Sequence, residues 1–287
     1  MRVVIVGAAG QLGRELAQLL RGGDLVCLTR ADLDLHDPAA VTARLVALAP
    51  AVVVNAAADN RVDAAEGDPT EAIAVNALAV AAMAHACRTI GAFLVQPSTD
   101  YVFDGRTTTP YAEEDRPNPL GAYARSKLAG ELLARTLAPR CAIVRVAGLY
   151  AVGGSRTKGA SFVDRVITRA RKGEQLRIVA DQLTAPTYAR DVAHTLARLL
   201  PRWLRGEVPG GIYHLTNAGA CSWFDFARTA LELSGITATL EPTSTAALAA
   251  QAPRPAYSVL ANTRLAAAGE PSLRPWQDAL AAYLAGE

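Results

Sequence analysis

Tyr123 and Lys127, in the segment "YARSK", have residue types and a spacing that could transfer a proton. Positions four residues apart lie on one face of a helix, so the phenol and the ammonium would be neighbours. We expect the ammonium to favour the phenolate and to lower the tyrosine pKa from its ordinary value of about 10. A phenol tuned in this way can donate a proton to a carbonyl oxygen. Helical Tyr/Lys pairs also arise by chance, so this one needs support from its surroundings.

The segment "STDYVFDG" provides the first support, because it places Thr99 at the end of a predicted strand. The preceding run, "GAFLVQP", is apolar and typical of a buried strand. An ordinary polar turn is the alternative interpretation. However, ligands of parallel sheets bind beyond the carboxyl ends of the strands, which is where Thr99 would stand. We therefore expect Thr99 to hydrogen-bond the same carbonyl oxygen as Tyr123.

The segment "GAAGQLG" is the second support, with Gly7, Gly10 and Gly13 between the first predicted strand and the first predicted helix. Gly7 permits a tight turn, Gly10 lets the backbone approach a pyrophosphate, and Gly13 lets the helix pack closely on the sheet. The helix N-terminus adds free N–H groups and a partial positive charge. Three turn glycines without a ligand are the alternative, and the strand-to-helix context favours the binding site.

The elements that would position these residues alternate between apolar strands and helices. Strands are expected at 2–6, 24–29, 51–57, 93–98 and 141–147, with helical segments between them, including a long helix at 69–91. Continuously apolar strands separated by helices predict an α/β fold with a doubly wound parallel sheet, of the Rossmann type. We expect a dinucleotide-binding domain at residues 1–150, to which the chain returns at about 185–217. A smaller C-terminal substrate-binding lobe would comprise residues 151–184 and 218–287.

Composition excludes several other classes of protein. The 287 residues are 51% hydrophobic and carry a net charge of +2, with no run of like charges that would bind nucleic acid or a membrane surface. We see no stretch of the ~20 apolar residues that a membrane span requires. The cysteines are scattered, which predicts free thiols and a cytoplasmic location. The histidines do not have metal-ligand spacings, so we predict no metal site.

The glycine spacing GxxGxxG, with "NAAA" at 55–58, resembles the extended branch of the short-chain dehydrogenase/reductase superfamily. The resemblance implies that Asp34 and Leu35 contact adenine and that the "NAAA" stretch lies beside the nicotinamide-side ribose. Arg30 follows the second strand, where an arginine accommodates a 2′-phosphate, which favours NADPH over NADH. A solvated surface arginine is the alternative, and nearby Asp32 could weaken the preference. The expected cofactor-binding residues are Gly7, Gly10, Gln11, Leu12, Gly13, Arg30, Asp34, Leu35, Ala56, Ala57, Ala58, Tyr123 and Lys127.

The segments "STDYVFDG", "NPLGAYARSKLAGE", "DQLTAPTYARDVA" and "GIYHLTNAGACSWFDFAR" resemble the dTDP-4-dehydrorhamnose reductase family over nearly the whole chain. That resemblance implies an NAD(P)H-dependent oxidoreductase that converts dTDP-4-dehydro-L-rhamnose to dTDP-L-rhamnose. It also implies a catalytic triad of Thr99, Tyr123 and Lys127. By position, the expected substrate-binding residues are Asn60, Thr99, Tyr101, Tyr123, Phe162 and Arg254. Asn76 resembles the family's helix-kinking asparagine, although a satisfied buried amide is an equal alternative.

Departures from the family pattern leave the sugar open. Gly148 stands where the family often has a tryptophan, Ser161 stands where an asparagine is common, and the loop at 152–160 is longer. A reductase or epimerase for another nucleotide sugar is therefore one alternative. A non-catalytic cofactor-binding subunit, resembling the regulatory subunit of methionine adenosyltransferase, is another. Dehydration is disfavoured, because Asp100 and Tyr101 follow Thr99 where the dehydratases carry an Asp-Glu pair. A homodimer, and a metal at its contact, stay open.

Overall fold

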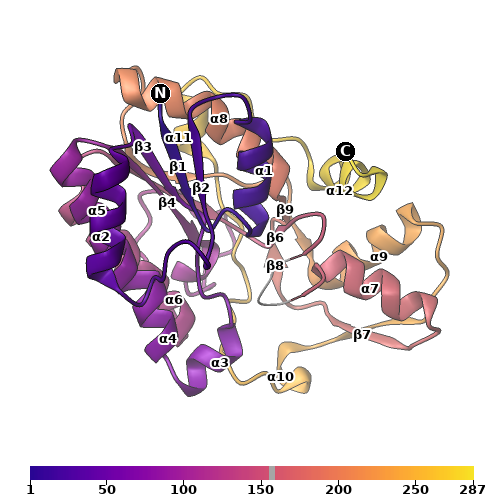
Figure 1. Cartoon of the computed structure of the whole chain (residues 1–287). Helices are drawn as coiled ribbons and strands as arrows, with labels where there is room; N and C mark the ends of the chain where they lie inside the picture. The colour runs from indigo at the N-terminus through magenta and orange to yellow at the C-terminus, as the bar shows by residue number, and fades with distance from the viewer. Residues whose placement is uncertain (155–158) are drawn as a thin grey trace.

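A six-stranded parallel sheet forms the centre of the first lobe in the computed structural model, which describes residues 1–154 and 159–287 (Figure 1). The strand order is β10-β5-β4-β3-β1-β2, and all neighbouring strands are parallel. The strands are β1 (Val3–Val6), β2 (Leu25–Leu28), β3 (Val52–Asn55), β4 (Phe93–Thr99), β5 (Cys141–Val146) and β10 (Gly211–His214). The chain reverses direction across the sheet between β1 and β3, where ligands of such folds bind. The predicted doubly wound α/β fold is confirmed.

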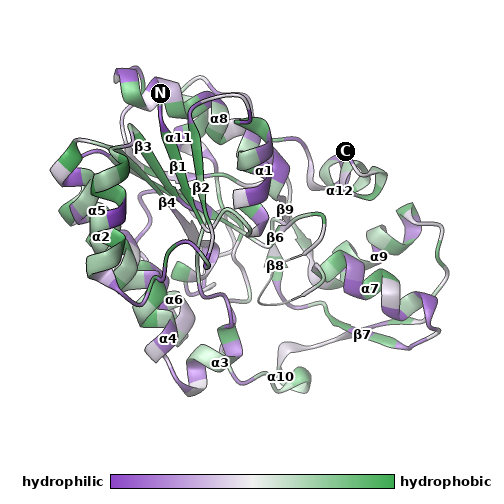
Figure 2. Cartoon of the chain, in the orientation of Figure 1, coloured by the Kyte–Doolittle hydropathy of each residue, from purple (hydrophilic) through white to green (hydrophobic). Residues whose placement is uncertain are grey.

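The central strands are apolar because helices cover both of their faces. Every residue of β1 and β3 is buried, and Figure 2 shows both strands as hydrophobic. Strands buried on both sides lose the apolar/polar alternation of a half-exposed sheet. The register sets Val6 opposite Asn55 and Thr99 opposite Val146. The carboxyl ends of β1, β3, β4 and β5 therefore meet at one edge of the sheet.

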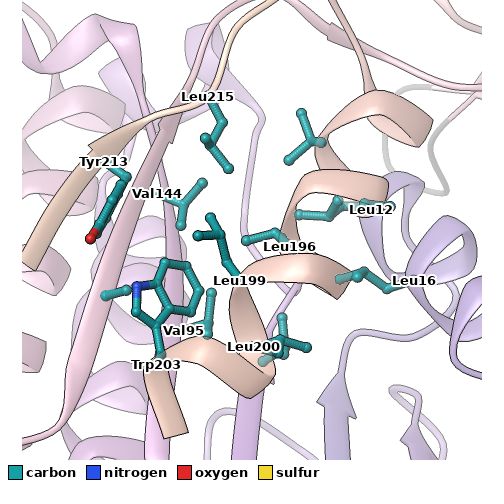
Figure 3. Close-up of a cluster of buried hydrophobic side chains, with 14 of the residues drawn as sticks. Leu12, Leu16, Val95, Val144, Leu196, Leu199, Leu200, Trp203, Tyr213 and Leu215 are labelled. Atoms are coloured by element: carbon teal, nitrogen blue, oxygen red, sulfur yellow. The ribbon is translucent and has the colours of Figure 1, made fainter. Parts of the chain in front are cut away.

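Two helices cover one face of the sheet, and three helices cover the other. Helices α1 (Gln11–Leu19) and α8 (Ala189–Arg205) pack together, and Figure 3 shows their leucines meeting Val95 and Val144 of the sheet. The opposite face packs against α2 (Pro38–Leu48), α5 (Ala79–Ile90) and α6 (Ala122–Leu137). Short elements complete this lobe: α3 (Val62–Gly67), α4 (Thr70–Ile73), the 3₁₀ turn η2 (Asp100–Val102) and α11 (Thr263–Ala267).

A short π-helical segment, η1 (Ala74–Leu78), interrupts the helix predicted to run through residues 69–91. The whole stretch Thr70–Ile90 is long and apolar enough to cross a membrane by length and composition, contrary to our expectation for the sequence. Half of its most apolar part is buried inside the protein, and α5 packs on α2 and α6. A buried core helix explains the same composition.

The second lobe gathers short strands and an aromatic core beside the first (Figure 1). Its main helices are α7 (Phe162–Arg171), α9 (Trp223–Leu233) and α12 (Trp276–Ala285). Its other elements are β6 (Leu149–Tyr150), β7 (Leu176–Val179), β8 (Leu183–Thr184), β9 (Thr187–Tyr188), β11 (Cys221–Ser222), β12 (Leu240–Thr243) and α10 (Thr245–Leu248). Strands pair as β6–β9, β7–β12 and β8–β11. The chain re-enters the main sheet at β10, and the predicted domain limits stay a prediction.

Candidate active site

The three predicted turn glycines form a closely packed turn between β1 and α1. Gly7 has a φ of +78°, and a Cβ there would lie 2.5 Å from the Ala57 nitrogen. A Cβ on Gly13 would lie 2.4 Å from the Gly7 carbonyl oxygen, and one on Gly10 would lie 3.2 Å from the same atom. Only glycine tolerates such contacts without a shift of the backbone. The glycines thus fit both predicted needs, a tight turn and close helix packing.

The N-terminus of α1 has the properties of an anion site. Gly10 caps the helix without a side-chain hydrogen bond, and the first turn contains no acidic residue. Its N–H groups and partial positive charge therefore favour an anion such as a pyrophosphate. Leu12 is buried in the core under α1, so any contact that it makes with a cofactor would come from its backbone. Gln11 is half-buried at the same turn.

The residues predicted to hold the adenine end lie beyond β2. Arg30 is exposed. The Asp32 carboxylate accepts hydrogen bonds from the Thr29 backbone nitrogen at 2.8 Å and the Thr29 hydroxyl at 2.7 Å. That carboxylate is thus engaged within its own turn. Leu35 is half-buried.

His36, which the sequence did not single out, joins Asp34 to α4. Its Nδ1 lies 2.8 Å from Asp34 Oδ1, and its Nε2 lies 2.7 Å from Glu71 Oε2. Hydrogen bonds that the imidazole makes to the two carboxylates, that to Glu71 foremost, raise the pKa of His36 above its ordinary value. This pairing holds the segment that contains Asp34 against the start of the long apolar stretch.

The end of β3 is held by a buried amide pair. The Asn55 Nδ2 donates to Gln96 Oε1 on β4 at 2.8 Å, and the Ala57 nitrogen donates to Asn55 Oδ1 at 3.2 Å. The predicted ribose-side residues, Ala56 to Ala58, are half-buried directly opposite Gly7. This pair thereby fixes the stretch that faces the glycine turn.

Thr99, Tyr123 and Lys127 are all buried at the carboxyl edge of the sheet, where β4 meets α6. The Tyr123 hydroxyl donates to Asn60 Oδ1 at 3.3 Å. The Lys127 ammonium donates to the Pro97 carbonyl oxygen at 2.8 Å, two residues before Thr99 on β4. The predicted substrate residue Asn60 is thus brought to the phenol. Helix α6 places the phenol and the ammonium on the face that meets β4.

The expected lowering of the Tyr123 pKa is wrong for this arrangement. Burial raises the pKa of the phenol above its ordinary value, and the nearby Asp100 carboxylate adds to the shift, while the Thr99 hydroxyl opposes it in part. Burial also lowers the pKa of Lys127 to about 8, although the Glu131 carboxylate counteracts this. The ammonium is directed to a backbone carbonyl instead of the phenol. The Tyr123 phenol is therefore protonated at neutral pH, which is the form that a proton donor requires.

Asn76 connects the site to the π-helical segment. It is both a buried amide with hydrogen-bond partners and a residue at the break in the helix. Its Oδ1 accepts from the Asp59 nitrogen at 2.9 Å, and its Nδ2 donates to the Asp59 carbonyl oxygen and to Ser126 Oγ. The amide is thus fully used, and it lies inside the π-helical segment that breaks the helix. Asp59 directly precedes Asn60, which contacts the Tyr123 phenol, and Ser126 lies on α6, which carries Tyr123. The Asn76 side chain therefore links the two segments that position the phenol.

Tyr101 lies beside the Tyr123 phenol, and Arg254 lies beside Tyr101. The Tyr101 and Tyr123 rings meet edge to face with centroids 6.2 Å apart. The Arg254 Nη2 donates to Asp63 Oδ2 at 2.8 Å, and its positive charge acts on the Tyr101 phenol. Arg254 belongs to the segment 251–260, here called the strap, which also donates from the Ala252 nitrogen to Asp63. Their roles toward a substrate stay predictions.

Phe162 lies in the aromatic core of the second lobe. Its ring centroid is 4.8 Å from that of Trp223 and 5.9 Å from that of Phe226. Its predicted substrate contact stays a prediction. Gly148 has a φ of +51°, and a Cβ there would lie 3.2 Å from the Trp223 ring. Of the longer loop expected at 152–160, residues 155–158 lie outside the described residues.

A buried ion pair beneath α6 is a feature that sequence reasoning missed. The Arg145 guanidinium of β5 donates to both Glu131 carboxylate oxygens, at 3.0 and 2.8 Å, and both side chains are almost fully buried. Glu131 lies in "KLAGE", four residues after Lys127, and no local spacing pairs it with Arg145. Asp100 is also buried here, although the sequence analysis used it only to exclude dehydration.

We searched the described residues for side chains that could hold a metal ion. There, no group of three or more His, Cys, Asp or Glu side chains is placed to hold a metal ion. The four cysteines are all free, with Cys27 exposed and the other three buried.

Comparisons with known proteins agree with this geometry. The whole chain, residues 1–287, matches the family described as "RmlD substrate binding domain". The chain is 42% identical over 283 residues to a Streptomyces griseus protein named dTDP-4-dehydrorhamnose reductase, covering 97% of this chain and 91% of that protein. It is also 36% identical to a Streptomyces niveus protein named dTDP-4-keto-6-deoxy-D-glucose reductase, covering 97% and 95%.

A solved structure is similar over the full length. It is a Bacillus anthracis dTDP-4-dehydrorhamnose reductase in complex with NADP, with a TM-score of 0.93 and 32% identity, covering 100% of this chain and 99% of that one.

Proposed function

This chain belongs to the RmlD substrate binding domain family, and we propose that it reduces the C4 ketone of a dTDP-4-keto-6-deoxy sugar. The substrate that its relatives' names favour is dTDP-4-dehydro-L-rhamnose, which would yield dTDP-L-rhamnose. The single observation that carries the proposal is a buried, protonated phenol, Tyr123, at the sheet edge beside Thr99 and Lys127. A neutral phenol in that place can protonate the oxygen of a ketone under reduction.

NADPH is the cofactor that the residues fit. The glycine turn leaves no room for a Cβ, and the first turn of α1 has no acidic side chain to oppose a pyrophosphate. When bound, NADPH supplies the hydride. Arg30 is exposed beyond β2 and is our assignment for the 2′-phosphate, with NADH as the alternative cofactor. The related Bacillus anthracis structure, which contains NADP, supports the choice.

The protein's own residues then have separate tasks. Tyr123 holds the proton that the sugar oxygen receives, and Asn60 orients the phenol through their hydrogen bond. Lys127 keeps a positive charge near the phenol, since its pKa of about 8 leaves most of the ammonium protonated at neutral pH. This charge would stabilise the phenolate left after proton transfer. Thr99 offers a hydroxyl to the same sugar oxygen, and the site's burial excludes water.

A reductase for a different dTDP-4-keto sugar is the second candidate. It is favoured by Gly148, where a tryptophan is common in the family, and by the relative named for dTDP-4-keto-6-deoxy-D-glucose. A non-catalytic regulatory subunit is less well supported, because the proton donor, the ammonium and the glycine turn all lie at the carboxyl edge of one sheet. A cytoplasmic location and a homodimer remain part of the proposal, the former supported by four free thiols.

Tyr123→Phe is the experiment that tests the proposal. NADPH oxidation would be followed with a panel of dTDP-4-keto sugars as substrates. We expect the variant to lose about 10²–10⁴-fold in kcat, which is the usual contribution of a positioned acid. Binding of NADPH, followed by its fluorescence, should be nearly unchanged, because the glycine turn is intact.

Tyr213→Phe is the matched control. It removes a phenol hydroxyl that donates to the Pro209 carbonyl oxygen, outside the catalytic group. We expect this variant to keep its turnover. Wild-type turnover in Tyr123→Phe would overturn the assignment of the proton donor.

A further inference from the structure

Asp100 carries a carboxyl group that is buried directly behind the catalytic threonine. The residue is 3% exposed and begins the 3₁₀ turn that follows β4. Its Oδ1 accepts a hydrogen bond from Thr99 Oγ1 at 3.0 Å. Its Oδ2 is buried and has no hydrogen-bond partner within residues 1–154 and 159–287. Ionising a buried carboxyl costs free energy when only one of its oxygens accepts a hydrogen bond. The burial of Asp100 at this position therefore needs an explanation.

The hydrogen bonds of Thr99 explain why this carboxyl matters. A threonine hydroxyl has one hydrogen and two lone pairs. Here the hydrogen points to Asp100 Oδ1, and one lone pair accepts from the Tyr101 nitrogen at 3.2 Å. An ionised Asp100 can only accept, so it retains the Thr99 hydrogen. A ketone oxygen also only accepts, and Thr99 would then have no hydrogen to offer it.

A protonated Asp100 reverses this hydrogen bond. The carboxylic O–H can donate to Thr99 Oγ1, which frees the Thr99 hydrogen for a ketone oxygen. Thr99 would still accept from the Tyr101 nitrogen, so both of its lone pairs and its hydrogen would be used. The state of the Asp100 carboxyl thus decides whether Thr99 can act as a donor.

The surroundings of Asp100 make this change accessible near neutral pH. Burial raises the pKa of Asp100 to about 6, while the nearby Ser258 hydroxyl, which does not complete a hydrogen bond to Oδ2, and the Thr99 hydroxyl oppose the shift. The Asp100 charge acts on the phenols of Tyr101 and Tyr123, both neutral because burial raises their pKa values. The Arg254–Asp63 ion pair acts on Tyr101 and contributes charges of opposite sign.

We propose that Asp100 is a positioning residue that sets the direction of the Thr99 hydroxyl, and that only its protonated form frees Thr99 to donate to the substrate ketone. This inference rests on the proposed ketone reduction. It assigns no proton transfer to Asp100 itself, because the carboxyl keeps its proton through the step while Tyr123 supplies the proton that the sugar receives.

The test is the pH profile of kcat/KM for ketone reduction in Asp100→Asn. In the wild type we expect kcat/KM to fall about tenfold or more as pH rises from about 5 to about 8, because a lost donor to the reacting oxygen costs at least that much. In Asp100→Asn the amide can donate to Thr99 at every pH, so this fall should disappear. A separate fall above about pH 8, from Lys127, should remain in both proteins.

Ser98→Ala is the control for this profile. It removes the neighbouring buried hydroxyl, which has no hydrogen-bond partner in the described part of the chain, and it should keep the wild-type fall. Turnover by the wild type together with an unchanged fall in Asp100→Asn would overturn the inference and leave the proposed function standing. Absence of turnover by the wild type with every sugar would instead overturn the proposed function, and this inference with it.

A second measurement does not depend on activity or on the folding of Asp100→Asn. Infrared difference spectra of the wild type across the same pH range should contain the band of a buried protonated carboxyl. In Thr99→Val that carboxylate loses its hydrogen-bond donor, so the midpoint of the band should move to higher pH. An unchanged midpoint would contradict the proposed contact.

Discussion

Burial shifts the pKa values of the catalytic side chains and so determines which of them are charged. The Tyr123 phenol stays neutral because a phenolate would be poorly solvated there, while the Lys127 ammonium becomes easier to deprotonate for the same reason. The two shifts are opposite in sign and have one cause. Arg254 differs, because its guanidinium keeps its charge and is paired with Asp63. The Arg254 guanidinium also acts on the Tyr101 phenol, and it is our assignment for the diphosphate.

Arg254→Gln should weaken substrate binding more than it slows the chemical step. A guanidinium fork matches phosphate oxygens, and a hydrogen bond to a charged group contributes about 1.5–3 kcal/mol. We therefore expect the KM for the dTDP-sugar to rise at least about tenfold, with a smaller change in kcat, measured by NADPH oxidation. Arg264→Gln, which removes an exposed arginine paired with Glu114, is the control. An unchanged KM in Arg254→Gln would remove Arg254 from the substrate site.

At the scale of elements, the catalytic helix α6 is held by close backbone contact with the π-helical segment η1. A Cβ on Gly130 would lie 2.1 Å from the Asn76 carbonyl oxygen. The segment η1 and Gly130 therefore face each other. The Asn76 carbonyl oxygen of η1 occupies the space that a side chain at position 130 would fill. The Asn76 side chain then bonds Ser126 of α6 and the backbone of Asp59. The position of Tyr123 depends on this packing, beyond the helical spacing of its own residues.

Gly130→Ala should separate α6 from η1. The added methyl group would collide with a backbone oxygen, and overpacking of this kind costs about 1–3 kcal/mol of unfolding free energy. Chemical denaturation would measure that loss, and kcat should fall with it because Tyr123 moves with α6. Gly23→Ala is the matched control, since its Cβ would make only an ordinary contact of 3.4 Å with Leu20. Equal stability of the two variants would contradict the role of the close contact.

At the scale of the whole molecule, a buried polar network joins the main sheet to the C-terminal part of the chain. His214 on β10 has Nε2 3.4 Å from the Arg145 guanidinium and Nδ1 3.0 Å from the Ala261 carbonyl oxygen. Only a neutral imidazole fits both neighbours, with Nδ1–H donating and Nε2 accepting. Ala261 directly follows the strap, and Leu260 of the strap bridges to Tyr111. The strap is therefore anchored through His214 and carries Arg254 to the site.

This arrangement predicts how stability depends on pH. Burial lowers the pKa of His214 to about 4, below the value of about 6.5 in the unfolded chain. Between these values the unfolded state binds more protons, so the contribution of His214 is full above pH 6.5 and is lost as pH falls to 4. The raised pKa of Asp100 acts in the opposite sense over the same range. The two effects can be separated only by substitution.

Urea unfolding of His214→Gln and the wild type at several pH values tests this prediction. The wild type should lose on the order of 2 kcal/mol more than the variant between about pH 6.5 and pH 4. His194→Gln, on the outer helix α8, is the control and should track the wild type. Parallel pH dependence in His214→Gln and the wild type would contradict a neutral buried imidazole.

Local patterns in the sequence were sufficient for the fold and the family. Apolar strand runs, a glycine turn between strand and helix, and "YARSK" each depend on neighbours within about one element, and short-range geometry determines what they form. The predicted doubly wound fold and the resemblance to the dTDP-4-dehydrorhamnose reductase family are both confirmed. The long helix over 69–91 was only partly right, because a π-helical segment breaks it where it meets Gly130 of α6, a contact distant in sequence.

Tertiary structure alone decided the electrostatics of the site. The direction of the Tyr123 pKa shift was predicted wrongly, because spacing along a helix says nothing about burial or about the Pro97 carbonyl that takes the Lys127 ammonium. The buried Asp100 behind Thr99, the Glu131–Arg145 pair and the arrival of Arg254 from the distant strap could not be read from local pattern. Desolvation and long-range contacts exist only once the chain has packed, and they determine which group holds the proton.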